Sequence, residues 1–337
     1  MLNRLLILIF FSISISACAD NSNDKNMVNN LIDYKYPKSI CYGRLTITVP
    51  KETEVNFGNS EYDGIKIEVN KDINSYENFK NFINKNIHEL KNTHHISENN
   101  LLNEEINFSV NEINSHIVVF RSSPNSVSMY QIYGYLYLPL KKSMLVLKGG
   151  AANGFIQSGV EDIKKILSNI KFSPTNKPGI CFDDFFIEDY DDKKMFMSEI
   201  YFSFPSYPEV RISIDNRSRL TTDEDLIKFS EKNLANIPIT ERALVNIKDI
   251  NIGERKISLM EGKEYSHHLS SRLSFNRGYE DIVWQYLGEM DDIKKSYVKY
   301  DLSSKNQNGD DINALVDQKR VIELGYFILN NLKNNDK

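Results

Sequence analysis

Short runs of alternating apolar and polar residues recur along this chain, and they predict β-strands. Leucine, isoleucine and valine alternate with threonines over residues 45–49, and a similar alternation returns over 65–69 and 210–214. Successive side chains of a strand point to opposite faces, so each run is expected to bury one face and expose the other. This pattern favours antiparallel sheets that are covered on one side.

Longer segments have the spacing of amphipathic helices. Apolar side chains recur every three or four positions over residues 75–92, and residues 221–238 repeat the pattern. Thr222 can cap the first turn of the second segment, and the three acidic residues after it suit the positive end of a helix dipole. Pro238 ends the pattern. Each segment is expected to pack its apolar stripe on a sheet.

The order of these elements occurs twice, which predicts an internal duplication. Each copy runs through strand, strand, helix, four strands and a closing helix. The matching segments are 105–121 with 250–269, 130–139 with 281–290, 141–150 with 294–305, and the closing helices 159–172 with 313–333.

The duplication predicts an α+β protein with two duplicated domains, each an antiparallel sheet backed by helices. We expect the N-terminal domain to span residues 37–173 and the C-terminal domain residues 180–333. The segment between them, 174–179, contains two prolines and a glycine, a composition that suits a short stiff linker.

The first eighteen residues have the charge and length of a secretory signal: Arg4, an apolar run, and small residues before Cys18. The apolar run is shorter than the ~20 residues that a spanning helix needs. Residues 15–18 resemble a bacterial lipobox, so residues 1–18 are expected to be a lipoprotein signal peptide with Cys18 as the lipidated first mature residue. A plain signal peptide cleaved nearby is the alternative.

Residues 19–36 follow as a polar, asparagine-rich segment, which predicts a flexible tether. Alanine rather than aspartate follows Cys18, and resemblance to bacterial sorting rules then favours the outer membrane over the inner. We therefore expect a periplasmic protein whose lipid anchor lies in the inner leaflet of the outer membrane. Several acyl chains on one cysteine hold a protein stably, whereas one chain binds only marginally.

Charge argues against a nucleic-acid partner. The chain has 41 basic and 46 acidic residues and a formal net charge of −5. No basic stripe is present to neutralise a phosphate backbone.

Two of the three cysteines, Cys41 and Cys181, occupy matching positions, because each opens the first strand of its copy. Disulfides persist in the periplasm. If the copies pack about a pseudo-twofold axis, equivalent positions near that axis meet, and a Cys41–Cys181 bond would join the two lobes. The alternative is two separate buried thiols.

Motifs for catalysis, metals or cofactors are missing from the sequence. It contains neither the Gly-x-Ser-x-Gly elbow of hydrolases nor a phosphate-binding Gly-x-x-x-x-Gly-Lys loop. The adjacent pairs His94-His95 and His267-His268 lack the helical spacing of a zinc site, so solvated positions in turns or strands are expected for them. The acidic clusters do not follow the calcium-loop pattern. No catalytic residue, metal site or cofactor is therefore predicted.

One strand carries candidate interface residues. Tyr133, Tyr135 and Tyr137 project to one face of the run 130–139, and Trp284 with Tyr286 occupies the matching run of the second copy. Tyrosine and tryptophan are enriched at binding hot spots, but they also suit a strand packed under a helix. Both interpretations, interface and core, stay open for these residues.

The whole pattern resembles the two-domain Tle cognate immunity proteins, which protect bacteria from phospholipase effectors of type VI secretion. The resemblance rests on CYGRLTITVPKETEV at the head of the first copy, the second Ile-Cys opening, and FNRGYEDIVWQYLGEMD over 275–291. The second opening, Cys181-Phe182-Asp183-Asp184, lacks the Gly-Arg of the first.

The resemblance implies a protein that is not an enzyme. It would bind a cognate phospholipase effector stoichiometrically, gripping it between two lobes and blocking its active site or lid. An envelope lipoprotein that binds a small ligand or scaffolds another assembly is the alternative. A hydrolase with an unrecognised carboxylate site is a further one.

Overall fold

The computed structural model describes residues 32–335, except 111–112, 173, 176, 184, 190–193, 227–244, 272–276, 305–311 and 314–317. The predicted signal peptide, Cys18 and most of the predicted tether lie outside the described residues. So does the predicted helix over 221–238 beyond Leu226. No helix in the described part is both long and apolar enough to cross a membrane.

The elements follow one order in both copies, which confirms the predicted α+β class with two domains. The first copy consists of β1 (Lys38–Tyr42), β2 (Leu45–Val49), β3 (Glu54–Tyr62), β4 (Ile65–Asn70), α1 (Tyr76–Asn92), β5 (Leu102–Val110), β6 (Ile113–Arg121), β7 (Met129–Leu138), β8 (Ser143–Ala152), α2 (Ile156–Ser168) and β9 (Ile170–Lys171).

The second copy has the corresponding strands and its closing helix. It consists of β10 (Gly179–Phe182), β11 (Phe185–Glu188), β12 (Phe196–Phe204), β13 (Tyr207–Arg217), β14 (Val245–Ile257), β15 (Met260–Ser271), β16 (Arg277–Tyr286), a 3₁₀ turn (Ile293–Lys295), β17 (Tyr297–Ser303), β18 (Ile312–Asn313), α5 (Gln318–Asn330) and β19 (Leu332–Asn334). Four strands open each copy, whereas the sequence pattern predicted two.

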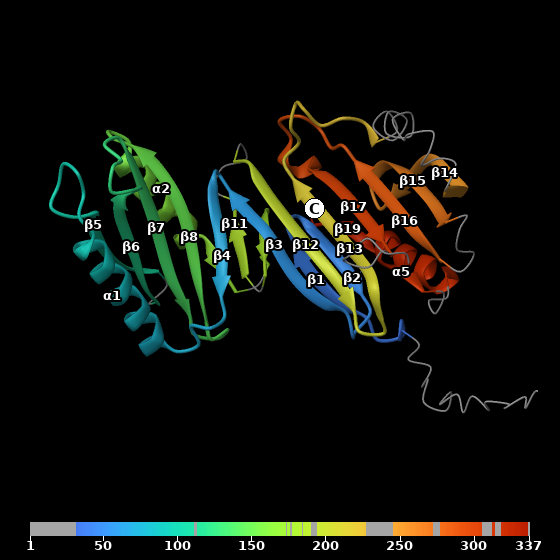
Figure 1. Ribbon diagram of the computed structural model, residues 1–337, viewed down its shortest axis with the longest axis horizontal. Coiled ribbons are helices and arrows are strands. Elements are labelled where there is room, and N and C mark those ends of the chain that lie inside the picture. Colours follow the sequence, from blue (N-terminus) through green and yellow to red (C-terminus); the bar gives the residue numbers. More distant parts are fainter. Residues whose placement is uncertain are drawn as a thin grey trace, which may run out of the picture.

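A thirteen-stranded sheet runs through both copies (Figure 1). Its order is β14-β15-β16-β17-β13-β12-β3-β4-β8-β7-β6-β5, with β18 paired to β16. The copies meet where β3 pairs antiparallel with β12, its equivalent in the second copy. Pairing between equivalent strands is what a pseudo-twofold axis requires.

The leading hairpins of the two copies are exchanged. Hairpin β1–β2 packs in the core formed by β12, β13, β16, β17 and α5, and hairpin β10–β11 packs in the core formed by β4, β6, β7, β8 and α2. We call these packing units the C-terminal lobe and the N-terminal lobe. Two small sheets show the same exchange, because β19 pairs with β2 and β9 pairs with β11. Each hairpin therefore completes the lobe of the other copy.

Burial explains why the exchange is stable. The side chains of Ile180, Phe182, Phe185 and Ile187 are all buried in the N-terminal lobe. Full burial of a large apolar side chain contributes about 1.5–3 kcal/mol, so the hairpin supplies on the order of 6–12 kcal/mol to that lobe before entropic costs. A typical domain is stable by only about 5–15 kcal/mol. Neither lobe is then expected to persist without the hairpin of the other copy.

Helix α1 illustrates how the sequence pattern becomes packing. The Ser75 hydroxyl accepts a hydrogen bond from the Asn78 amide at 3.1 Å and caps the helix. Phe79, Ile83 and Ile87 are buried, as their spacing predicted. They cover the face of β6, β7 and β8 opposite to the face covered by α2 (Figure 1).

The exchange predicts that fragments cut at the repeat boundary will not fold. A fragment of residues 37–173 lacks β10–β11, whereas a fragment of residues 50–189, of nearly the same length, contains that hairpin. We expect only the second fragment to show cooperative urea unfolding by circular dichroism. Cooperative unfolding of 37–173 alone would contradict the exchange.

Candidate functional site

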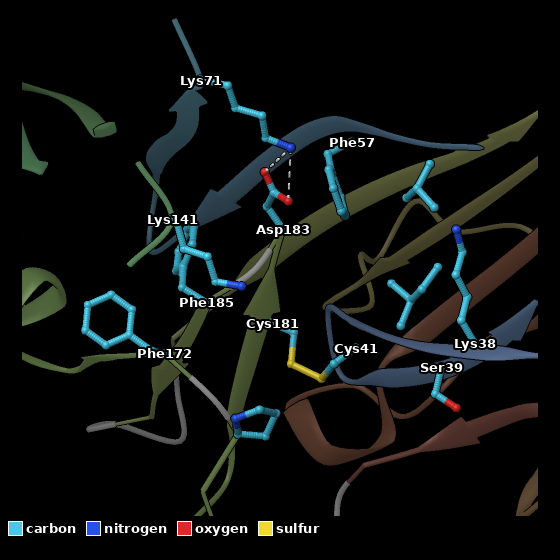
Figure 2. Close-up of a pocket in the computed structure, with 13 residues that line it drawn as sticks. Lys38, Ser39, Cys41, Phe57, Lys71, Lys141, Phe172, Cys181, Asp183 and Phe185 are labelled. Atoms are coloured by element: carbon cyan, nitrogen blue, oxygen red, sulfur yellow. Dashed lines mark hydrogen bonds and ion pairs between the residues drawn. A yellow bond between two sulfur atoms is a disulfide. The ribbon is translucent and has the colours of Figure 1, made fainter. Parts of the chain in front are cut away.

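Three hollows lie close together around strands β3 and β4: two are at the junction between the lobes, and the third is beside α1 in the N-terminal lobe. Their volumes are ≈ 460, ≈ 640 and ≈ 480 Å³. Lys71 lines all three hollows, and Phe57 and Asp183 line the first two. Because they share these residues, we treat them as one surface and name it the junction groove. Figure 2 shows the hollow nearest to the disulfide.

An ion pair connects the two sides of the junction groove. Lys71 follows β4 directly, and its Nζ lies 3.1 Å from an oxygen of Asp183, in the turn between β10 and β11. The same Nζ lies 5.7 Å from the ring centre of Phe57 (Figure 2). A partly exposed pair contributes at most about 1 kcal/mol to stability. Its importance is its position, since it joins the sheet of the first copy to the exchanged hairpin of the second.

The hairpin turns at the groove have matching backbone geometry. Gly43 follows β1 with φ = 56°, and Asp183 follows β10 with φ = 48°. Glycine adopts this left-handed conformation without strain, and aspartate tolerates it better than most residues. The lack of a Gly-Arg pair in the second opening therefore leaves its turn conformation unchanged.

Packing requires glycine at position 43. A Cβ atom there would lie 2.3 Å from the side-chain oxygen of Asn216, which is too close. That oxygen accepts a hydrogen bond from the Arg44 amide at 2.7 Å. The amide group of Asn216 donates in turn to the Ser296 hydroxyl and the Tyr297 carbonyl. Asn216 thus connects the turn of the first hairpin to β13 and β17 of the second copy.

Arg44 is a buried charge whose partner comes from the second copy. Its side chain is 0% exposed, and its guanidinium lies 2.5 Å from the Asp189 carboxylate. The Tyr62 hydroxyl donates to the other oxygen of that carboxylate at 3.1 Å, and the Phe196 ring centre lies 5.3 Å from the guanidinium. A buried charge without a partner is very costly, so this contact specifies how the two copies dock.

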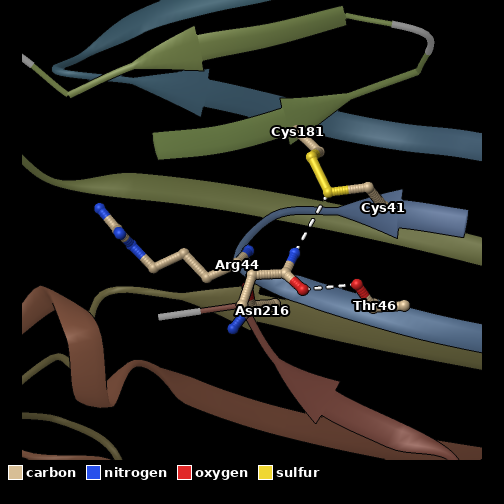
Figure 3. The surroundings of a disulfide bond; sticks show 6 residues. Cys41, Arg44, Thr46, Cys181 and Asn216 are labelled. Atoms are coloured by element: carbon tan, nitrogen blue, oxygen red, sulfur yellow. Dashed lines mark hydrogen bonds between the residues drawn. A yellow bond between two sulfur atoms is a disulfide. The ribbon is translucent and has the colours of Figure 1, made fainter. Parts of the chain in front are cut away.

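Cys41 and Cys181 form a disulfide, with their Cα atoms 5.6 Å apart (Figure 3). Beside it, the backbones of Gly43 and Cys181 exchange two hydrogen bonds, at 2.8 and 2.9 Å. The side-chain amide of Asn335 donates to the Cys41 sulfur and accepts from the Thr46 hydroxyl. The bond therefore lies where the exchanged hairpins cross, and it joins the lobes at one wall of the junction groove.

The tyrosines predicted as interface candidates lie largely beneath α1. Tyr135 and Tyr137 are buried, and Tyr133 is partly buried against the same cluster. The Tyr137 hydroxyl donates to the Asn74 carbonyl at 3.2 Å. Tyr133 and Tyr135 also line the hollow beside α1. Burial raises the pKa of Tyr135 above its usual value, so its hydroxyl stays protonated and can donate.

Trp284, the other interface candidate, is fully buried in the C-terminal lobe. Its indole N–H donates to the Arg255 carbonyl at 3.0 Å. The ring lies directly against Gly262, where an added Cβ would approach within 2.4 Å. The structure thus places Trp284 away from the surface.

Metal-ligating side chains do not cluster in the described part of the chain. Over the residues that the structure describes, no group of three or more His, Cys, Asp or Glu side chains could hold a metal ion. His95, expected in a solvated position, is instead fully buried, and its Nε2 lies 2.8 Å from the Ser126 carbonyl oxygen. The side chains of His267 and His268 lie outside the described residues.

The sequence pattern placed Cys41, Cys181, Tyr133 and Tyr135, which line the junction groove, but it did not indicate the ion pairs that join the two copies. Lys71 and Asp183 are 112 positions apart, and Arg44 and Asp189 are 145 apart. Each pair crosses between copies, so no local spacing indicates it. The one signal was the matching position of Cys41 and Cys181, which marked where the copies meet.

Both copies match family models. The Tle cognate immunity protein 4 N-terminal domain matches residues 38–149, and the C-terminal domain of the same family matches residues 173–333. No curated protein sequence matches this chain.

Solved structures of immunity proteins share the fold. The apo immunity protein TplEi of the type VI secretion system from Pseudomonas aeruginosa is 18% identical, with a TM-score of 0.76 over 91% of this chain and 100% of that one. A crystal structure of a Tle4–Tli4 complex gives 18% identity and a TM-score of 0.73, over 90% and 99% of the two chains. TplEi complexed with an "L" peptide is 16% identical, with a TM-score of 0.71 over 90% of this chain and 100% of that one. At these identities the likeness concerns the fold.

The buried pair predicts a large effect of removing one charge. Arg44→Met takes the guanidinium from the Asp189 carboxylate and should lower the free energy of unfolding by about 3–5 kcal/mol. The double variant R44M/D189N removes both charges and should regain part of that loss. Urea denaturation of the unmutated protein, R44M, D189N and the double variant measures the coupling.

Lys71→Met is the matched control, because it removes a partly exposed pair with Asp183 and should cost at most about 1 kcal/mol. If R44M were as stable as K71M, the buried pair would not hold the copies together.

The disulfide predicts a redox-dependent stability. Replacing Cys41 and Cys181 by serine, in a soluble form with Cys18 also replaced, should cost about 2–5 kcal/mol. The fold should remain, because the Gly43–Cys181 backbone bonds do not need the sulfurs. In urea denaturation, the stability of the protein with unmutated cysteines in reductant should match that of the double serine variant. Equal stability of the oxidised protein and the double variant would show that the bond constrains nothing.

Proposed function

This chain belongs to the Tle cognate immunity protein 4 family, whose two domain models match residues 38–149 and 173–333, and we propose that it protects a bacterium by binding a type VI secretion phospholipase effector. The match to both domains, in order, is the observation that carries this proposal. The fold shared with a chain of the Tle4–Tli4 complex supports it. In this role the chain is a stoichiometric inhibitor and performs no catalysis.

The architecture suits such an inhibitor because its lobes are already fixed. A continuous sheet, the exchanged hairpins, the disulfide and the Arg44–Asp189 pair all connect them. A binding surface that is ordered before the encounter does not lose that conformational entropy on binding. We therefore propose that the effector is gripped between preformed lobes, over the junction groove, with its active site or lid blocked.

Localisation is part of the proposal. A lipid anchor on Cys18, in the inner leaflet of the outer membrane, would hold the inhibitor beside the membranes that a phospholipase attacks. The polar segment after Cys18 would act as a linker that lets the folded domains extend away from the membrane surface.

Titration tests the proposed function. The soluble form, without its signal and with Cys18 replaced, is mixed with the product of the neighbouring gene, which we expect to be a phospholipase with a Gly-x-Ser-x-Gly motif. Phospholipase activity should fall to zero near one equivalent, and a complex should elute from a sizing column. An interface above the ~1,600 Å² of a standard complex is expected for a two-lobed grip.

Undiminished activity without a complex would contradict the proposal. It would favour the alternative of an envelope lipoprotein that binds a small ligand or scaffolds another assembly.

A further inference from the structure

One hairpin of the large sheet is closed in the second copy and split in the first. Strands β12 and β13 pair along their length, from Met197–Arg217 to Phe204–Tyr207. Their equivalents β3 and β4 pair only at the tip, through Glu61–Lys66 and Tyr62–Ile65. Beyond the tip, β3 continues along β12 while β4 continues along β8. Figure 1 shows the two strands diverging from their shared turn.

A bulge in β3 accounts for the split. Ser198 and Ile200, two positions apart on β12, face Ser60 and Phe57, three positions apart on β3. The extra residue of β3 lies at Gly58 or Asn59. Such a bulge bends a strand and increases its twist, which turns β3 away from β4. Glycine is needed at position 58, since a Cβ there would lie 2.6 Å from the Tyr201 ring.

The gap between the strands is open space. The hollow of ≈ 640 Å³ is lined by successive residues of β3, from Val55 to Ser60, and of β4, from Lys66 to Val69. Successive residues of a strand point to opposite faces, so a hollow that touches all of them lies at the strand edges. We name this gap the β3–β4 slot.

Alternation along β4 shows which backbone groups face the β3–β4 slot. Tyr62 and Ile65 flank a two-residue turn, Asp63-Gly64, in which both residues have positive φ. In this type of hairpin the flanking residues form the hydrogen-bonded pair, so their N–H and C=O groups point between β3 and β4. Ile67 and Val69 lie two and four residues after Ile65, so their N–H and C=O groups point the same way, into the β3–β4 slot.

We propose that the β3–β4 slot receives an extended segment of the effector as an added strand. This inference rests on the proposed function and names where the partner binds. A strand edge whose N–H and C=O groups face open space, as at Ile67 and Val69, is complementary to one ligand chemistry, an extended peptide backbone. At ~3.3 Å per residue, the slot beside Ile67–Asn70 accommodates a segment of ~4–5 residues.

The side chains around the β3–β4 slot determine which residues of that segment are expected to be apolar and which polar. Phe57 lies opposite Ile200 in the register, so it belongs to the apolar face, and Phe182 lines the same hollow. Glu199 and Tyr201 alternate with buried residues of β12 and lie on the other face. The Glu199 carboxylate accepts hydrogen bonds from Tyr201 and Asn59, both neutral donors. The expected segment therefore has apolar residues inward and a basic residue outward.

Amide hydrogen exchange tests the added strand directly. The probe is the phospholipase encoded by the neighbouring gene, with its nucleophilic serine replaced by alanine, mixed with the soluble immunity protein. The amides of Ile67 and Val69 should exchange quickly in the free protein and at least about tenfold more slowly in the complex. Strand β13 is the internal control, because it is paired on both sides and should be protected throughout.

Val69→Pro and Val69→Ala form the matched pair of variants. Both substitutions remove apolar contacts of the Val69 side chain, but only proline removes the N–H that faces the β3–β4 slot. This N–H takes no part in the ladder with β8, so its loss leaves that pairing intact. Val69→Pro should bind the probe about tenfold more weakly than Val69→Ala in calorimetry. Thermal unfolding of both variants checks that the fold is kept. If Val69→Pro unfolds, the exchange experiment on the unmutated protein decides alone.

The outcomes separate the two proposals. A complex in which Ile67 and Val69 exchange as fast as in the free protein overturns the slot and leaves the proposed function intact. Equal affinity of two folded Val69 variants also overturns the slot. Absence of any complex overturns the proposed function and this inference with it.

Discussion

Two hairpins cross at the centre of the molecule, and each fills the core of the lobe formed by the other copy. The crossing point is marked by the Cys41–Cys181 bond and by the backbone pairing of Gly43 with Cys181. Because each hairpin buries large apolar side chains in the opposite lobe, separating the lobes would expose both cores. The relative position of the lobes is therefore set by the same interactions that stabilise each of them.

Polar contacts then restrict how the crossing is made. The buried Arg44 guanidinium pairs with the Asp189 carboxylate of the other copy. The side-chain oxygen of Asn216 accepts a hydrogen bond from the backbone amide of Arg44. Apolar packing alone tolerates small shifts, whereas a buried charge penalises any arrangement that leaves it unpaired. The first opening of the chain, Cys-Tyr-Gly-Arg, supplies the disulfide, the left-handed turn and this charge within four residues. The motif is thus structural, and it prepares a rigid surface for a partner.

The two copies differ where a partner is expected to bind. Hairpin β12–β13 is a complete ladder, while β3–β4 opens after two pairs because of the bulge at Gly58 and Asn59. A closed hairpin completes the sheet of the C-terminal lobe, and an open one exposes strand edges beside the junction groove. Duplication provided two equivalent hairpins, so one could stay paired along its length while the other exposed its edges.

Local patterns determined much of this protein without a structure. Alternation identified β2, β4 and β13, the helical spacing identified α1 and its buried face, and the repeated order indicated two related α+β domains. These features depend on which side of each element is exposed to water, and the order of apolar and polar residues along the chain shows which side that is. The exchange of hairpins, the Arg44–Asp189 and Lys71–Asp183 pairs and the slot beside β3 were decided only in three dimensions. They join residues more than a hundred positions apart or depend on one extra residue in a ladder, and no local periodicity encodes either.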